Sequence, residues 1–446
     1  MSLCWLESDF SSLLSGIHPE EWVLFRRFLD KILEFRSFFR IFARQNIPTM
    51  TEGKNIYLDS KPRYEILDGL RGVAALMVVC FHLFEVYSHG DSTQQIINHG
   101  YLAVDFFFVL SGFVVGYAYD DRWDRMSVGG FFKRRLTRLH PMLILGTFIG
   151  LLLYYLQDST FFPHISEVPV WKAVLVALIG MTLFPVRGYG AFDVRGWGEM
   201  HPINGPAWTL FFEYIANFLY AVVLRRLPRW VLMGCVLLFA GMTLDVTLNI
   251  DLFHVLGERG PNANTVIGGW NVYSPLERYI GFTRLLYPFF CGLLLSRIPA
   301  RIRMKGGFWW CSLLIVVLLS VPFIPYGEKG TAGCMDGWFN ALCILLLFPL
   351  IVSIGAGSRL EGKKGMKVCK FLGDISFPLY ISHYPLMYCH MAWVSNHPDA
   401  PLSIHAFLFV AFLLLSTMMA YACLKLYDEP VREWLKENWL KGKRNK

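Results

Sequence analysis

An arginine and a histidine stand at the two ends of one apolar segment, RGVAALMVVCFH, which runs from Arg71 to His82. Eleven helical steps bring the two side chains within about 20° of each other around the axis and about 16.5 Å apart along it. A histidine can take a proton from a hydroxyl as a general base, and an arginine can bind phosphate. The spacing predicts two chemical functions on one face of one helix.

Three more ionisable side chains lie inside apolar segments: Asp105 in GYLAVDFFFVLSGF, Glu213 in NGPAWTLFFEY and His383 in LGDISFPLYISHYPL. A carboxylate beside a histidine can orient the ring and stabilise the imidazolium. Ser111, in the same segment as Asp105, is an additional candidate. Structural alternatives stay open: Asp105 can pair with an arginine, His383 can bond a carbonyl, and close helix packing explains Ser111 better than catalysis does.

The segment RRLTR supplies a compact cationic cluster of Arg134, Arg135 and Arg138. The planar guanidinium group forms paired hydrogen bonds with phosphate, so this cluster suits a large anionic donor. The alternative is an ordinary basic flank of a membrane span, and the cluster gains weight only from its companions.

Composition places these groups in a membrane. Of the 446 residues, 54% are hydrophobic and only 17% are charged, and the mean hydropathy is +0.42. These values are typical of a multi-spanning protein. The net charge of +8 comes from short basic runs between apolar segments, which indicates cytoplasmic loops and no nucleic-acid partner. The ten cysteines are scattered without ligand spacing, so we expect neither a metal site nor a disulfide framework.

Eleven apolar runs follow one another along the chain, and most approach the ~20 residues that a membrane span requires. They cover approximately residues 67–88, 101–119, 139–156, 170–186, 206–224, 230–248, 279–297, 308–325, 338–356, 371–393 and 403–427.

The positions of lysine and arginine predict the topology. They alternate correctly only if the run at 170–186, bracketed by Pro169 and Pro185, is re-entrant or interfacial. The expected fold is therefore an all-α integral membrane protein with about ten transmembrane helices and both termini cytoplasmic. Arg71 then lies near the cytoplasmic end of the first span, and His82 in its outer half.

Three regions are expected. Residues 1–60 form an N-terminal amphipathic, cytoplasmic extension, 61–435 the multi-span domain and 436–446 a basic cytoplasmic tail. Phenylalanines at helical spacing among arginines favour a helix lying on the inner leaflet for the first segment. The alternative is that translation starts at Met50 and the preceding segment is dispensable.

The motifs together resemble the membrane-bound acyltransferase 3 family. Its signature, an arginine, ten residues and a histidine in the first span, matches Arg71 and His82. GYLAVDFFFVLSGF, FFKRRLTRLHP, NGPAWTLFFEY, LGDISFPLYISHYPL and YDEPVR resemble later motifs in the same order, over residues 64–435. One departure is His140, where an aliphatic residue is expected.

The resemblance implies an enzyme of the cell membrane that moves an acyl group, often acetyl, from cytoplasmic acyl-CoA to a hydroxyl of a saccharide, lipid-linked glycan or related acceptor. It implies that His82 is catalytic, that Arg71 and the RRLTR arginines contact the donor, and that Glu213 is a site residue. Trp208, in the tryptophan and glutamate segment that it shares with Glu213, is an additional candidate. No bound cofactor is expected, because acyl-CoA is a co-substrate. A covalent acyl-histidine is a less favoured variant.

Two other classes of protein remain as alternatives. A transporter or flippase can use intramembrane His82, Glu213 and Arg71 to couple protons or anions, although a second interrupted helix is not seen in the other half of the chain. A scaffold or sensor explains the topology but gives no reason for the buried polar groups. The acceptor and the oligomeric state are not predicted.

Overall fold

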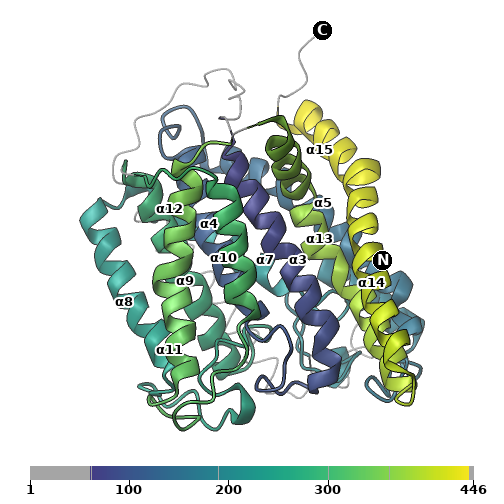
Figure 1. Cartoon of the computed structure of the whole chain (residues 1–446). Coiled ribbons are helices and arrows are strands. Elements are labelled where there is room, and N and C mark those ends of the chain that lie inside the picture. The colour runs from purple at the N-terminus through teal and green to yellow at the C-terminus, as the bar shows by residue number, and fades with distance from the viewer. Residues whose placement is uncertain (1–60, 62, 189, 300, 361, 441–446) are drawn as a thin grey trace, which may run out of the picture. The chain divides into compact units, whose positions relative to one another are not determined.

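The computed structural model describes residues 61, 63–188, 190–299, 301–360 and 362–440, which form helices joined by loops (Figure 1). This part of the chain contains no strand, and one isolated bridge pairs Ser159 with Phe162. The all-α class is confirmed for the described residues. The extension predicted over residues 1–60 lies outside them, as does the predicted tail beyond residue 440.

Each apolar run predicted from the sequence coincides with one helix or with helices in direct succession. The α-helices are α3 (Glu65–Ser88), α4 (Ala103–Tyr119), α5 (Val128–Leu153), α6 (Val170–Met181), α7 (Ala207–Val222), α8 (Arg229–Thr247), α9 (Pro275–Arg297), α10 (Gly307–Ser320), α11 (Met335–Leu342), α12 (Phe348–Gly357), α13 (Lys363–Asn396), α14 (Leu402–Cys423) and α15 (Glu429–Leu435). Short 3₁₀ turns cover Gly100–Leu102, Tyr154–Gln157, Gly190–Phe192, Leu224–Arg226 and Gly260–Asn262, and π-helical turns cover Cys343–Leu347, Leu424–Asp428 and Lys436–Leu440.

Within the described residues, seven helical stretches are long and apolar enough to cross a membrane. They are Glu65–Ser88, Gly100–Tyr119, Val128–Gln157, Arg229–Thr247, Pro275–Arg297, Met335–Gly357 and Leu402–Leu440. With 16 and 14 residues, α7 and α10 fall short of the usual span, and α13 begins with a lysine-rich turn. The protein is a multi-pass membrane protein, and the finer count of ten stays a prediction.

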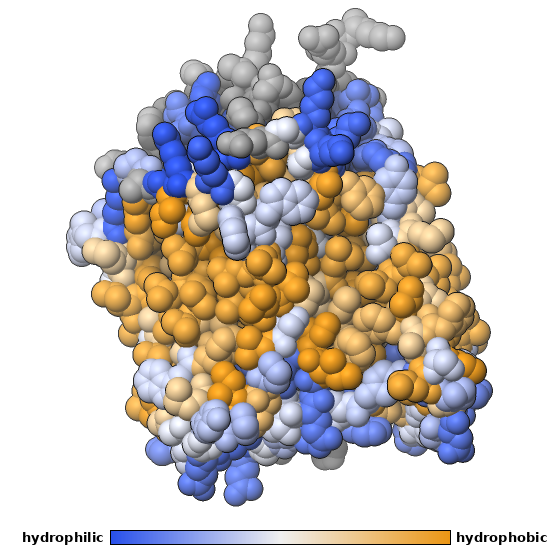
Figure 2. Space-filling view, viewed as in Figure 1, coloured by the Kyte–Doolittle hydropathy of each residue, from blue (hydrophilic) through white to orange (hydrophobic). Residues whose placement is uncertain are grey.

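Basic residues gather at one end of the helical bundle, which is uppermost in Figure 1. This basic end carries the start of α3 and the α4–α5, α9–α10 and α12–α13 connections. A band of hydrophobic side chains lies below it on the visible face, and hydrophilic side chains return at the opposite end (Figure 2). This layering is the surface expected of a protein whose middle contacts lipid chains.

The helix pairing that positions Arg71 and His82 is that of α3 with α13. A β-carbon on Gly72 of α3 would overlap the carbonyl oxygen of Leu372, and one on Gly373 of α13 would lie 2.7 Å from the Asp68 side chain. Both positions have room only for hydrogen. Helices in lipid associate through such close packing, because lipid chains leave little hydrophobic drive between them.

We expect Gly72→Val to separate α3 from α13 and to lower the free energy of unfolding by about 1–3 kcal/mol, the usual cost of overpacking. The measurement is unfolding in mixed detergent micelles. Gly234→Val is the matched control, since no atom lies within 4 Å of the position of its β-carbon on α8. Equal losses in both variants would contradict the close-packing account.

Candidate functional site

The α3–α13 pairing places Arg71 against α13. Its Nε donates to the Ser376 hydroxyl at 2.8 Å, and a terminal nitrogen donates to Asp68, one turn earlier on α3, at 3.1 Å. Ser376 in turn donates to the Gly373 carbonyl at 2.8 Å. These bonds hold the guanidinium at a fixed place near the basic end of the bundle.

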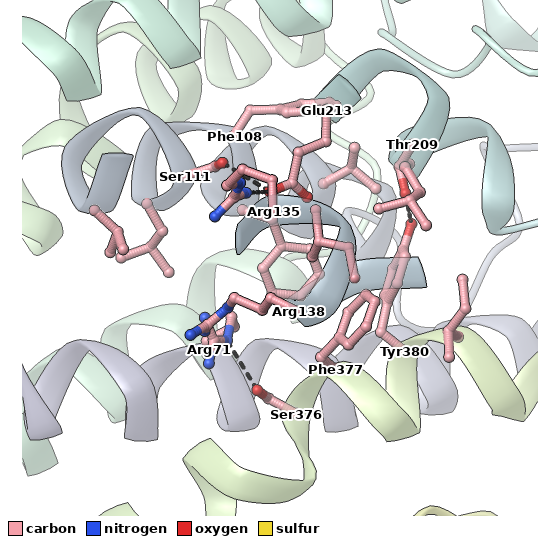
Figure 3. Close-up of a pocket in the computed structure, with 17 residues that line it drawn as sticks. Arg71, Phe108, Ser111, Arg135, Arg138, Thr209, Glu213, Ser376, Phe377 and Tyr380 are labelled. Atoms are coloured by element: carbon pink, nitrogen blue, oxygen red, sulfur yellow. Dashed lines mark hydrogen bonds and ion pairs between the residues drawn. The ribbon is translucent and has the colours of Figure 1, made fainter. Parts of the chain in front are cut away.

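Arg71 lines a pocket enclosed by α3, α4, α5, α7 and α13, with a cavity volume of about 110 Å³ (Figure 3). Figure 3 shows the Arg71 and Arg138 guanidinium groups side by side, with Arg135 and Glu213 on another wall. Phe107, Phe108, Leu110, Ser111, Val114, Leu139, Thr209, Leu210, Phe377, Tyr380 and Ile381 also line the pocket. It thus combines a cationic mouth with an apolar interior.

Glu213 is held from two sides. Arg135 on α5 forms an ion pair with it, and the Ser111 hydroxyl on α4 donates to it at 3.1 Å. Arg135 is almost completely buried. The predicted site residues Ser111, Arg135 and Glu213 therefore form one cluster, in which the carboxylate balances the charge of the buried arginine.

Arg138 lines the same pocket, and in the described part of the chain it makes no hydrogen bond or ion pair. Arg71 beside it already shares its charge with Asp68. The pocket consequently keeps a surplus of positive charge. Arg134 does not line it and donates to the Gly130 carbonyl of its own helix at 3.1 Å, so its predicted donor contact has no counterpart in the pocket.

Further along α3, His82 pairs with a carboxylate that the sequence analysis did not single out. Its Nδ1 lies 2.8 Å from Oε2 of Glu85, three residues later. A carboxylate only accepts, so Nδ1 donates its hydrogen and the lone pair of the neutral ring is on Nε2. This is the tautomer that a general base requires.

A second imidazole faces the first. The His82 and His383 ring centroids are 5.5 Å apart, and the ring of Tyr384 stands edge-on to His82 at 4.8 Å. Nδ1 of His383 donates to the Tyr380 and Leu379 carbonyls at 2.9 and 3.1 Å. Its buried Nε2 has no hydrogen-bond partner and is an acceptor in this tautomer. The expected carbonyl bond of His383 thus exists alongside a free acceptor nitrogen.

The pocket ends before it reaches these imidazoles. Tyr380 and Thr209 line its far end, joined by a hydrogen bond of 3.0 Å between their hydroxyls. Phe107 packs edge-on against Tyr380 with ring centroids 5.3 Å apart. Neither His82 nor His383 lines the pocket, so Arg71 lies in the pocket and His82 lies outside it.

Two predicted candidates lie elsewhere, around an arginine of α9. Arg284 donates to both carboxylate oxygens of Asp105 at 2.9 and 3.4 Å and to the Tyr101 carbonyl at 2.6 Å. Its guanidinium lies 5.3 Å from the ring of Trp208. Asp105 and Arg284 are both buried. The arginine partner considered for Asp105 is present, and the structure brings neither Asp105 nor Trp208 into the pocket.

Sequence reasoning missed Glu85, Ser376, Tyr380 and Arg284. A signal existed for Glu85, because three residues after His82 is one helical turn. It also existed for Arg284, a charge within an apolar run. Ser376 and Tyr380 carry no comparable signal. The described residues contain no group of three histidine, cysteine, aspartate or glutamate side chains placed to hold a metal ion.

The segment between α6 and α7 packs against α13 near His82 and His383. The Tyr388 ring packs edge-on against that of Tyr384, one turn earlier in α13. The Tyr388 hydroxyl donates to the two carboxylate oxygens of Glu199 at 2.8 and 3.0 Å. Arg195 lies 3.5 Å from the centroid of the Tyr388 ring and donates to Gln157 at 2.8 Å. Burial raises the pKa of Glu199 to about 7, although Arg195 opposes the shift.

Comparisons with known proteins point in one direction. A family model described as an acyltransferase domain matches residues 64–422. The chain is 24% identical over 82% of its length to acyltransferase MdmB of Streptomyces mycarofaciens, covering 92% of that protein. It is 22% identical over 83% of its length to O-acetyltransferase OatA of Staphylococcus aureus, covering 58% of that protein. Protein 2 in the picA locus of Rhizobium radiobacter is 32% identical over 36% of the chain. No solved structure matches significantly.

The raised pKa of Glu199 predicts a pH dependence of stability. Because the folded state binds its proton more tightly, the stabilisation is present below the ordinary glutamate pKa and is lost as the pH rises through about 7. We expect the wild-type free energy of unfolding to fall by about 2–3 kcal/mol more between pH 5 and 8 than that of Glu199→Gln. The control is Glu167→Gln, which removes an exposed carboxylate. Identical pH slopes for Glu199→Gln and wild type would contradict the prediction.

Proposed function

This chain belongs to the acyltransferase family whose domain matches residues 64–422, and from that membership we propose how its site works. The protein is a membrane O-acyltransferase, as its relatives' names indicate. We place acyl-CoA at the basic end and a saccharide, lipid-linked glycan or related hydroxyl acceptor at the opposite end. The observation that carries the proposal is the His82–Glu85 pair beyond the end of a cationic pocket.

The donor binds through the arginines at the mouth of the pocket. Arg138 supplies a guanidinium without an intramolecular partner in the described chain, and Arg71 lies beside it in Figure 3. Both suit the phosphates of coenzyme A. The acyl-pantetheine arm then lies along the apolar wall that includes Phe107 and Phe377, and the thioester passes Tyr380 to reach His82.

His82 acts as the general base. Nε2 accepts the proton of the acceptor hydroxyl while its oxygen attacks the thioester carbonyl carbon, and the Glu85 carboxylate stabilises the imidazolium. The resulting tetrahedral oxyanion can accept a hydrogen bond from the Tyr380 hydroxyl. The C–S bond breaks, the ester forms, and the imidazolium returns the proton to the coenzyme A thiolate. Each bond and proton is accounted for without an acyl-histidine.

The proposed orientation puts the basic end in the cytoplasm of a cell-membrane protein, with both termini on that side. Ten helices span the membrane in this proposal, and α6 is the re-entrant or interfacial segment. Its 12 residues are short for a span, and Leu183, just after it, packs with Leu143 and Leu210 inside the bundle. The comparisons name acyltransferases and lend no support to the transporter alternative.

We expect His82→Ala to lower kcat for acceptor-dependent thiol release from acetyl-CoA by about 10²–10⁴-fold, the usual contribution of a general base. Glu85→Gln should cause a smaller loss, because a neutral amide still orients the ring but does not balance its charge. The control, His164→Ala, removes an exposed imidazole. Undiminished release in His82→Ala would rule out the proposed base.

Removal of the unpaired guanidinium should weaken donor binding. We expect Arg138→Gln to raise KM for acetyl-CoA by about 10-fold or more with kcat little changed, because a hydrogen bond to a charged group contributes about 1.5–3 kcal/mol. Arg125→Gln, on the exposed α4–α5 connection, serves as the control at the same end. A loss of kcat with unchanged KM would contradict a donor-binding role for Arg138.

A further inference from the structure

A second basic depression lies at the basic end, apart from the site described above. It has a volume of about 630 Å³ and is formed by the start of α3, the α9–α10 connection, the end of α12 and Met366 of α13. Its charged lining consists of Arg63, Arg301, Arg303 and Arg359 with Glu65. We propose that this arginine bowl binds the headgroup of an anionic phospholipid from the adjacent leaflet.

The bowl is distinct from the donor pocket because an aromatic wall lies beside it. Tyr64 lines the bowl and stands edge-on to Phe113 of α4, with ring centroids 5.3 Å apart. The Arg301 guanidinium lies 5.2 Å from the same Phe113 ring. The two cavities share no lining residue. A ligand in the bowl therefore does not depend on the acyl-transfer site.

Only some of the arginines of the bowl form hydrogen bonds or ion pairs with other described residues. Arg63 donates to Asp374 at a long 3.4 Å, and Arg301 donates to the Ile298 and Ser296 carbonyls. Within the described residues, Arg303 and Arg359 make no hydrogen bond or ion pair. Against four arginines stands Glu65 as the acidic lining residue. Guanidinium groups arranged in this way suit a phosphodiester, to which each can donate two hydrogen bonds.

The neighbouring surface indicates that the anion belongs to a lipid. Trp309 and Trp310, in the first turn of α10, are 59% and 62% exposed, and exposed tryptophans are typical of the headgroup level. Ser358 of the bowl meets the start of this helix, because a β-carbon on Gly307 would overlap its hydroxyl oxygen. Leu313, further along α10, is also exposed, and Figure 2 shows a hydrophobic band under the basic end of the bundle.

The shape of the bowl also suits a headgroup. Gly355 and Gly357 line it, and a β-carbon on Gly357 would overlap the Ile302 carbonyl oxygen. The α12 end and the α9–α10 connection can thus approach each other at the floor while the arginines occupy the rim. A volume of about 630 Å³ lies within the usual range of small-molecule sites. A glycerophosphate headgroup would fit there with its chains leaving along α10.

The test compares lipid retention by the full chain in nanodiscs of phosphatidylcholine containing 20% spin-labelled phosphatidylglycerol. In Arg303→Gln/Arg359→Gln we expect the preference for the labelled lipid to fall by about five-fold per arginine removed, because each substitution removes direct hydrogen bonds to the phosphate. The control, Arg122→Gln/Arg125→Gln, removes the same charge from another connection at the same end and should change the preference less than two-fold. Thermal unfolding of both variants checks that they are folded.

Three outcomes would overturn the proposal. Unchanged retention in Arg303→Gln/Arg359→Gln would mean that the bowl binds no lipid. Equal losses in both double variants would mean that general positive charge, with no defined site, attracts the lipid. If millimolar inorganic phosphate displaces the labelled lipid as effectively as unlabelled phosphatidylglycerol does, the bowl is a site for a soluble anion. None of these measurements requires acyl transfer.

Discussion

The close approach of α3 to α13 is the constraint on which the site depends. With hydrogen as the side chain at Gly72 and Gly373, the two backbones come near enough for Arg71 to bond Ser376 at one level. Three turns further along, the same pairing brings His82 against the ring of His383. A wider separation would break both contacts together, because they lie on one rigid pair of helices. One packing interface thus sets the positions of the Arg71 guanidinium and the His82 imidazole.

Around this pair, buried charges are neutralised locally, except at Arg138. Asp105 pairs with Arg284 and Glu213 with Arg135, so the desolvation of each ion is partly offset by its partner. Arg138 departs from this pattern, since no described residue pairs with it. A partly buried guanidinium without a hydrogen bond costs free energy, and in the proposed mechanism the phosphates of the donor offset that cost.

Local periodicity was sufficient to predict that Arg71 and His82 share a face, because both lie on one helix. The pattern of apolar runs also predicted the helical segments, and each predicted run is helical in the structure. Local periodicity does not predict contacts between distant segments. Asp105 and Trp208 both contact Arg284, which lies 179 residues after Asp105 in the chain. No spacing rule connects these helices. The number of spans was likewise not decided by apolarity, because the 34 residues of α13 include polar and basic groups that face protein or the interface.

The Tyr380–Thr209 hydrogen bond has a consequence for the membrane itself. In the proposed mechanism the donor comes from one side of the membrane and the acceptor from the other, so an open path between them would let protons and small ions run down their gradients. Here the pocket stops at a packed hydroxyl pair covered by Phe107, with the imidazoles beyond it. In the proposed mechanism, the Tyr380 side chain insulates the bilayer between turnovers and moves aside for a group as small as an acetyl thioester. The seal of the membrane and the passage of the acyl group then depend on the same few side chains.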